Sequence, residues 1–281
     1  LLMNAKEETF YDIFILNSSK INLHKEQLDE LPKYFNRCRI QYRVVDNTFD
    51  QAFEIRGITA ATYYRLLIPE LIPEYDKVIY ADVDIIFRMD LSELYNTEIG
   101  ENYIAATREL GMNLMEDGQK HIHSLPALSV GNYIQAGFII MNTKAILKNN
   151  IHILFKEWSD KKLKFQDQDI LNIVCKDKIY YLPMKYNMTD YSYMLTMRKR
   201  SLLQNLFSVE EIDNALKRGN IHYNGHKPWK KYSVNFDIWW EYYRKSPFFD
   251  EKFYFEFFYT RLNELDQLSL WKRIKILIRY F

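Results

Sequence analysis

The chain has 281 residues, of which 48% are hydrophobic and 16% aromatic, enough to bury a sizeable core. Its 38 basic and 37 acidic residues leave a formal net charge of +1, which excludes an overall field that would draw the protein to nucleic acid. We therefore expect no nucleic-acid partner, and any anionic ligand must be bound locally. No stretch approaches the roughly 18 consecutive apolar residues that a membrane-spanning helix needs.

The pattern of the chain alternates β-rich runs with helical periodicity. Strands are predicted at 11–16, 42–46, 77–87, 135–142 and 178–183. Helices are predicted at 24–35, 59–72 and 169–175. This alternation favours a mainly parallel sheet covered on both faces, in one α/β domain that extends to about residue 240.

The remaining segment, 241–281, is predicted to be a C-terminal helical extension rich in aromatic residues. Near its end apolar side chains recur every three or four residues among basic ones, at Trp271, Ile274, Ile278 and Phe281 and at Lys272, Arg273, Lys275 and Arg279. Such a helix can lie in an anionic membrane interface through residues 268–281. The alternative is a helix packed on the body of the protein with a solvated basic face.

Cysteine usage and the start of the chain bear on its compartment. Cys38 and Cys175 lie far apart without C-x-x-C spacing, so we expect two free core thiols in a reducing compartment. The first residues lack the charged and apolar regions of a signal peptide. We therefore expect a cytoplasmic protein, with peripheral attachment to the inner face of the cell membrane as an additional option.

A D-x-D pair, Asp82 and Asp84, interrupts the apolar run VIYADVDIIF. Burying two carboxylates costs several kcal/mol, of order 3–5, unless they are compensated, and a metal is a natural partner. In a continuous strand both acids emerge on one face, with Val83 on the other. Oxygen ligands suit Mn²⁺ or Mg²⁺, which also take phosphate oxygens of a substrate. The alternative is a strand end whose aspartates begin a turn.

Two further segments carry polar residues in patterns that suit a ligand site. In FQDQDILNIV, Asp167 and Asp169 stand at a helix start, where capping is the plain explanation, but Gln168 has no such role. In HYNGHKPW, His222 can ligate a metal, Gly225 lets the backbone approach a ligand and Lys227 offers charge for phosphate. Together these segments predict a metal-bridged diphosphate beside a sugar pocket.

The segments ATYYRLLIPELIPEYDKVIYADVDIIF, YIQAGFIIMNTK, QDQDILNIV and IHYNGHKPWKK, in this order, resemble glycosyltransferase family 8. This family comprises retaining GT-A enzymes and includes bacterial lipopolysaccharide galactosyl- and glucosyltransferases. The resemblance covers most of residues 55–235 and implies a GT-A fold with a Rossmann-like mixed sheet flanked by helices. It also implies a Mn²⁺-dependent hexose transfer from a UDP-sugar to a glycan or lipid-linked glycan, in lipopolysaccharide or surface polysaccharide synthesis.

Carried over residue by residue, the resemblance implies specific roles. Asp82, Asp84 and His222 would hold Mn²⁺ against the diphosphate. Catalytic roles would fall to Gln168, on the ring face away from the leaving group, to Asp167, on the sugar hydroxyls, and to Asp169, in support. Besides Asp82, Asp84, Asp167 and Gln168, the residues implied to bind the donor are Arg65, Val83, Gln135, Ala136, Gly137, Gly225 and Lys227.

The chain departs from the family pattern at several positions. Gln135 stands where the family commonly has asparagine, and the HYNGHKPW loop is one residue shorter than the common form. The resemblance also implies a first nucleotide-binding strand that nothing in residues 1–240 matches. Alternatives to a hexosyltransferase are a non-catalytic sugar-nucleotide or glycan-binding protein and, less favoured, a nucleotidyltransferase, which would need a glycine-rich phosphate loop.

Overall fold

The computed structural model describes residues 1–18, 24–45, 49 and 60–280. The chain forms two compact units, Leu1–Gly225 and His226–Phe281. The predicted division near residue 240 stays a prediction. Three end positions of predicted elements, Asp46, Thr59 and Phe281, lie outside the described residues.

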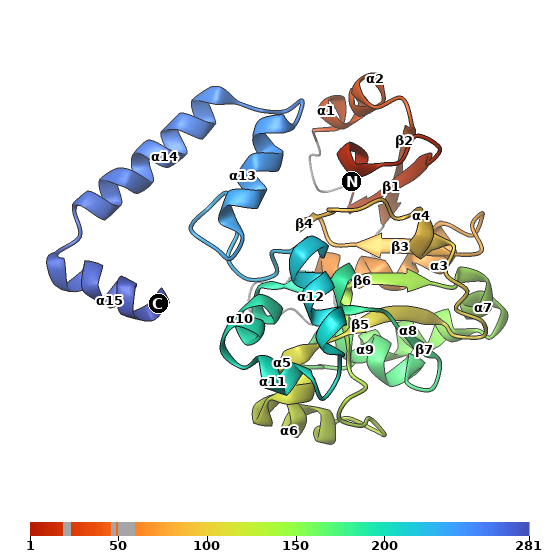
Figure 1. Cartoon of the computed structure of the whole chain (residues 1–281). Coiled ribbons are helices and arrows are strands. Elements are labelled where there is room, and N and C mark those ends of the chain that lie inside the picture. The colour runs from red at the N-terminus through yellow and green to blue at the C-terminus, as the bar shows by residue number, and fades with distance from the viewer. Residues whose placement is uncertain (19–23, 46–48, 50–59, 281) are drawn as a thin grey trace. The chain divides into compact units, whose positions relative to one another are not determined.

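The first unit opens with the short 3-10 helix η1 (Leu2–Asn4) and a pair of parallel strands, β1 (Tyr11–Ser18) and β2 (Cys38–Val45). Between them lie α1 (Lys25–Asp29) and α2 (Leu31–Tyr34), as Figure 1 shows. The helix predicted at 24–35 is therefore divided at Glu30. Pro32 explains the division, because a proline has no N–H to continue a helix but suits the first turn of a new one.

A four-stranded sheet forms the centre of the first unit. Its order is β3-β6-β5-β7, and the strands are β3 (Val78–Ala81), β6 (Ile134–Met141), β5 (Ile104–Arg108) and β7 (Ile179–Tyr181). β6 runs antiparallel to both neighbours, and β5 runs parallel to β7. The mainly parallel sheet expected from the pattern is therefore wrong here, and the sheet is mixed. After β5 the chain turns back, so that β6 pairs antiparallel with β5 and no crossover connection over the sheet is needed.

Both faces of this sheet are covered, because successive side chains of a strand point to opposite sides. Ile139 and Met141 pack into one buried cluster with residues of the helices, whereas Phe138 and Ile140 pack into the cluster on the other face. The helices that contribute to the first cluster are η3 (Ala60–Leu67), α3 (Ile68–Leu71), α7 (Thr143–Lys148), α8 (Ile151–Ser159) and α9 (Gln166–Cys175). Figure 1 shows α7, α8 and α9 beside the sheet.

A small sheet of order β4-β9-β8 completes the scaffold of the site, with β4 (Ile85–Ile86), β9 (Ile221–His222) and β8 (Met188–Thr189). β9 pairs antiparallel with β4 and parallel with β8. The other helices of the unit are α4 (Ser92–Tyr95), α5 (Leu110–Leu114), α6 (Glu116–Ser124), η4 (Met184–Tyr186), α10 (Asp190–Arg198), α11 (Arg200–Leu203) and α12 (Val209–Arg218). Cys38 and Cys175 are buried free thiols, as predicted.

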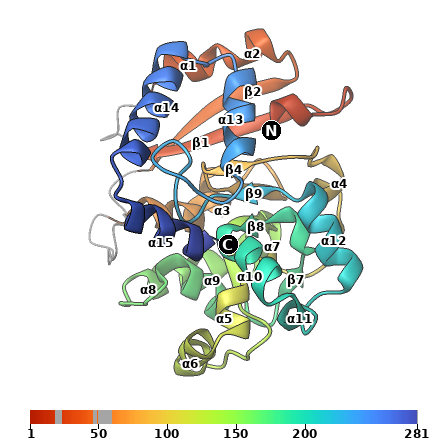
Figure 2. The ribbon, with the colours of Figure 1, turned by 60° about the vertical axis from the view of Figure 1, so that its left-hand side comes forward.

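The second unit consists of the predicted helices, α13 (Phe236–Lys245), α14 (Glu251–Asp266) and α15 (Leu270–Tyr280), which follow one another in Figure 2. Trp240 is 1% exposed and centres an aromatic cluster, with the rings of Phe257 and Phe258 at 4.7 and 5.0 Å. Aromatic packing of this kind stabilises a small helical unit. Within the described residues, no helix has both the length and the apolar character to span a bilayer.

Candidate functional site

The acidic pair lies in a turn between two sheets. β3 ends at Ala81 and β4 begins at Ile85, so Asp82, Val83 and Asp84 connect the four-stranded sheet to the small one. The continuous strand predicted at 77–87 is therefore wrong at its centre. Aspartate is disfavoured in strands and favoured in turns, where its side chain satisfies nearby backbone groups. Val83 stands fully exposed at the tip of the turn.

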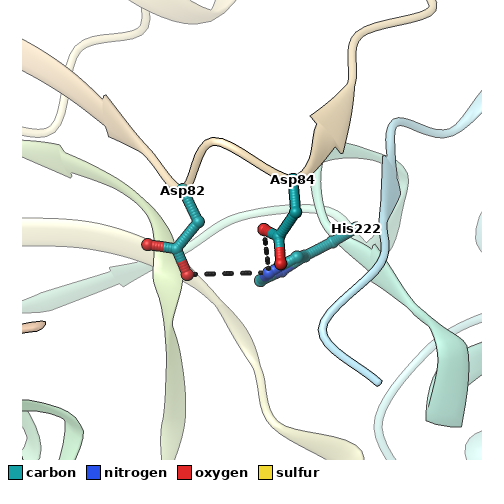
Figure 3. A group of neighbouring side chains, drawn as sticks. All are labelled: Asp82, Asp84 and His222. Carbon is teal, nitrogen blue, oxygen red and sulfur yellow. Dashed lines mark ion pairs between the residues drawn. The ribbon is translucent and has the colours of Figure 1, made fainter. Parts of the chain in front are cut away.

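His222 meets both acids. It lies at the end of β9 and pairs in register with Ile85, which brings the imidazole under the turn. Its Nε2 lies 3.2 Å from Asp84 Oδ1 and 3.6 Å from Asp82 Oδ2, and Figure 3 shows the three side chains pointing toward one another. One possible ligand atom from each side chain lies within 4.8 Å of the others, so the group could hold a metal ion. Two carboxylates and one imidazole suit Mn²⁺.

Gly137 leaves space for this group. A Cβ at this position would lie 2.4 Å from His222 Cε1 and 2.5 Å from Asp82 Oδ2, both far inside contact distance. The backbone also fixes the turn, because the N–H of Asp82 donates to the carbonyl of Gly137 at 2.8 Å. The glycine is therefore needed for space rather than for an unusual backbone conformation.

Arg65, on η3, joins the acidic turn to α9. Its Nη2 lies 3.0 Å from Asp82 Oδ1, and its Nε lies 3.0 Å from Asp167 Oδ2. Its Nη1 donates to the carbonyl of Ala136 at 2.5 Å. Burial works against the charge, but the two carboxylates hold the pKa of Arg65 above its usual value, so the guanidinium stays protonated. The positive charge therefore lies between the two acidic segments that the sequence singled out.

The start of α9 is shaped for contacts with distant residues. Gln166 has a φ of 45°, a strained conformation for a residue other than glycine, and is 2% exposed. Asp167 accepts a hydrogen bond from Thr62 Oγ1 at 2.5 Å, and burial raises its pKa while Arg65 opposes that shift. Gln168 Oε1 accepts the N–H of Ala136 at 3.1 Å. The predicted site segment thus lies against β6.

Asp169 lies behind this segment and has partners that sequence reasoning missed. Its carboxylate is 0% exposed and accepts from Tyr133 OH at 2.5 Å and from the N–H of Phe165 at 2.9 Å. His121 Nε2, on α6, lies 2.9 Å from it. Burial, together with the charge of Asp169, raises the pKa of Tyr133 well above its usual value, so this phenol remains a donor. No local pattern in the sequence connects His121 or Tyr133 to α9.

The other residues that were predicted to bind the sugar donor, apart from the metal group and α9, lie in different parts of the structure. Gln135 Oε1 accepts from Asn187 Nδ2 and from the N–H of Gly137, each at 2.6 Å. Gly225 lies against Asp190 at the start of α10, since a Cβ there would lie 2.7 Å from its Oδ2. Lys227 belongs to the second unit, and its contact with a diphosphate stays a prediction.

Comparison with known proteins decides the family. A sequence profile described as Glycosyl transferase family 8 matches residues 1–233. The chain belongs to glycosyltransferase family 8. It is 30% identical over 219 residues to the lipopolysaccharide 1,3-galactosyltransferase of Salmonella typhimurium, a match that covers 75% of this chain and 61% of that enzyme. It is 26% identical over 274 residues to general stress protein A of Bacillus subtilis, with 94% and 88% covered.

The fold agrees with the family. The galactosyltransferase LgtC, solved in complex with donor and acceptor sugar analogs, superposes with a TM-score of 0.68 at 23% identity. The superposition covers 87% of this chain and 88% of the LgtC chain. The GT-A fold expected from the sequence is confirmed. The chain spans less than two thirds of the length of several relatives, 58% of a Haemophilus influenzae protein for example.

Proposed function

We propose that this family 8 protein is a retaining, Mn²⁺-dependent hexosyltransferase, which moves glucose or galactose from a UDP-sugar to a glycan or lipid-linked glycan acceptor. The observation that carries the proposal is the convergence of Asp82, Asp84 and His222, with Arg65 joining them to Asp167. The relative in Salmonella typhimurium is a lipopolysaccharide galactosyltransferase by name, which favours bacterial lipopolysaccharide or surface polysaccharide as the product.

The metal side of the site would bind the diphosphate. A divalent cation there would offset the negative charge that develops on UDP as the bond to the anomeric carbon breaks. Asp82, Asp84 and His222 would supply its protein ligands, and Mg²⁺ could replace Mn²⁺ less well because it prefers oxygen ligands. The family resemblance makes Lys227 a further candidate for the diphosphate.

The sugar side would be formed by the start of α9 and by β6. Gln168, held by the N–H of Ala136, would lie beside the ring and steady positive charge at the anomeric carbon, since a neutral amide is a poor nucleophile. Arg65 opposes the rise that burial causes in the pKa of Asp167 and so favours the carboxylate form, which would accept from sugar hydroxyls. Gln135 would present its Nε2 to the donor, because its oxygen already accepts two hydrogen bonds.

The test is the release of UDP from UDP-glucose and UDP-galactose in the presence of Mn²⁺, with and without a panel of glycan acceptors. We expect release with one donor, a loss of at least about 100-fold in kcat/KM for Asp84→Asn, and no change for Asp76→Asn, an exposed acid paired with Lys144. Metal-dependent UDP binding without hydrolysis or transfer would instead favour the non-catalytic sugar-nucleotide or glycan-binding protein.

The second unit suggests where the enzyme meets its acceptor. On α15 the apolar residues Trp271 and Ile278 are 75% and 76% exposed, and Lys272 and Lys275 are exposed as well. Apolar and basic side chains exposed on one helix suit an anionic membrane surface, where lipid-linked acceptors are found. The test is sedimentation with anionic and with neutral vesicles. The variant Trp271→Ser/Ile278→Ser should lose binding to anionic vesicles and keep the hydrolysis of UDP-sugar.

A further inference from the structure

A buried hydrogen-bonded group lies directly behind His222. Asn187, between η4 and β8, is 3% exposed, and its Oδ1 lies 3.0 Å from His222 Nδ1. Its Nδ2 donates to Gln135 Oε1 at 2.6 Å, and the same oxygen accepts the N–H of Gly137 at 2.6 Å. A line of hydrogen bonds therefore runs from the backbone of β6 to the imidazole.

The backbone N–H at one end of this line determines which atom of each side chain donates and which accepts. The N–H of Gly137 can only donate, so Gln135 must present its oxygen there. That oxygen cannot donate, so Asn187 must present its NH₂ group to Gln135 and its oxygen to His222. A ring nitrogen that faces an amide oxygen carries the proton. The Nδ1 atom of His222 is therefore the protonated one in the neutral ring.

The other ring nitrogen faces the acidic pair. With the proton on Nδ1, the lone pair of the neutral ring lies on Nε2, 3.2 Å from Asp84 Oδ1 and 3.6 Å from Asp82 Oδ2. We propose that Asn187 is a positioning residue, which holds His222 in the Nδ1–H tautomer so that the Nε2 lone pair can ligate a divalent cation. The inference rests on the proposed metal-dependent function and names a residue that acts through His222.

Removing Asn187 should harm the ligand in two ways. Asn187→Ala takes the acceptor from the Nδ1–H of an imidazole that is 1% exposed, so the ring can adopt the other tautomer or rotate. It also frees Gln135 from its second partner. Asn187→Asp keeps an acceptor for Nδ1 and should bind metal more nearly like the wild type. Asn149→Ala, at an exposed amide just after the end of α7, is the matched control.

The first measurement needs no metal. In protein labelled with ¹⁵N-histidine, the ring nitrogen signals report the tautomer, and the His222→Gln spectrum assigns them. At a pH where the ring is neutral we expect a protonated Nδ1 and an unprotonated Nε2 in the wild type, and a mixture or the reverse in Asn187→Ala. A protonated Nε2 in the wild type would overturn the proposal.

The second measurement is Mn²⁺ binding in the presence of UDP, followed by electron paramagnetic resonance. We expect Asn187→Ala to weaken binding by about 10- to 100-fold, as is usual when the partner of a ligating histidine is removed, and Asn149→Ala to change nothing. Unchanged binding in a folded Asn187→Ala would refute the positioning role and leave the proposed function intact. Absent Mn²⁺ binding in the wild type, with the Nδ1–H tautomer present, would refute the proposed function instead.

A second variant tests the proposal if Asn187→Ala does not fold. Gln135→Met removes the oxygen that orients Asn187 while preserving most of the side-chain volume. With Asn187 free to rotate, we expect the same change of tautomer as in Asn187→Ala and a smaller loss of Mn²⁺ affinity. A uniform Nδ1–H tautomer with wild-type affinity in this variant would contradict the role assigned to the line of hydrogen bonds.

Discussion

Arg65 and Asp167 form a buried ion pair, with Nε and Oδ2 3.0 Å apart and side chains only 7% and 6% exposed. The same guanidinium lies 3.0 Å from Asp82, so one cation joins the acidic turn to the start of α9. Two segments that are distant in the sequence thus rely on the same positive charge. Loss of the guanidinium should leave both carboxylates without their cationic partner.

Replacing this arginine should therefore cost stability as well as activity. Arg65→Met leaves Asp167 buried without a cation, and we expect the free energy of unfolding at pH 7 to fall by about 3–5 kcal/mol in urea denaturation. Arg200→Met is the matched control, because its pair with Asp213 is 39% and 57% exposed, and should cost less than about 1 kcal/mol. Equal costs for the two variants would show that burial of the pair contributes little.

The carboxylate of Asp169 offers a second test of buried pairing. His121→Leu removes one of its partners, and we expect a loss of about 2–4 kcal/mol, because the carboxylate is 0% exposed. The double variant His121→Leu/Asp169→Leu should cost less than the sum of the single variants, by about 1–3 kcal/mol. The cycle is measured by urea denaturation. Strict additivity would mean that His121 and Asp169 do not interact.

The elements could be predicted where the local pattern is strong. The buried run around Phe138 gives β6, and the helical spacing of Ile170, Leu171 and Val174 gives α9. The direction of the strands could not be predicted, because a strand buried on both faces shows the same apolar run in a parallel and in an antiparallel pair. The mixed order of the central sheet is therefore a property of the connections, which periodicity does not reveal.

The site divides in a similar way. Asp82, Asp84 and His222 were predicted because D-x-D and a histidine near a glycine form local patterns, although the turn that unites the acids was only the alternative to a continuous strand. His121 and Asn187 were missed because each is a single polar residue whose meaning depends on a partner far along the chain. Sequence patterns identify residues that touch a ligand more readily than residues that position them.

Space at Gly137 gives a prediction about metal binding. In Gly137→Ala the new Cβ would lie 2.4 Å from His222 Cε1 and 2.5 Å from Asp82 Oδ2, so both side chains must shift. We expect Mn²⁺ affinity to fall by at least about 10-fold while the strand tolerates alanine, with a stability loss of about 1–3 kcal/mol. Isothermal titration with Mn²⁺ and UDP measures the affinity. Wild-type affinity would show that the cation does not need this arrangement.

The acid stability of the first unit should depend on Asp12, on β1. The guanidinium of Arg39, whose Nε donates at 2.8 Å, holds the pKa of Asp12 well below its usual value, and Tyr75 and Gln41 contribute further hydrogen bonds. A carboxyl whose pKa is lowered in the folded state makes its full contribution to the free energy of unfolding at pH values above its unfolded pKa of about 3.9. This contribution is lost progressively as the pH falls below that value.

Asp12→Asn should therefore change the pH dependence of unfolding as well as its free energy. At pH 7 we expect it to cost about 1–2 kcal/mol in urea denaturation, toward the lower value because Arg39 is 60% exposed and solvent screens the pair. The difference in the free energy of unfolding between Asp12→Asn and the wild type should become smaller as the pH falls from 5 toward 2. Asp76→Asn, at an acid that is 73% exposed, should follow the wild-type curve throughout. A gap for Asp12→Asn that stays constant over this range would mean that the carboxylate is not ionised preferentially in the folded state.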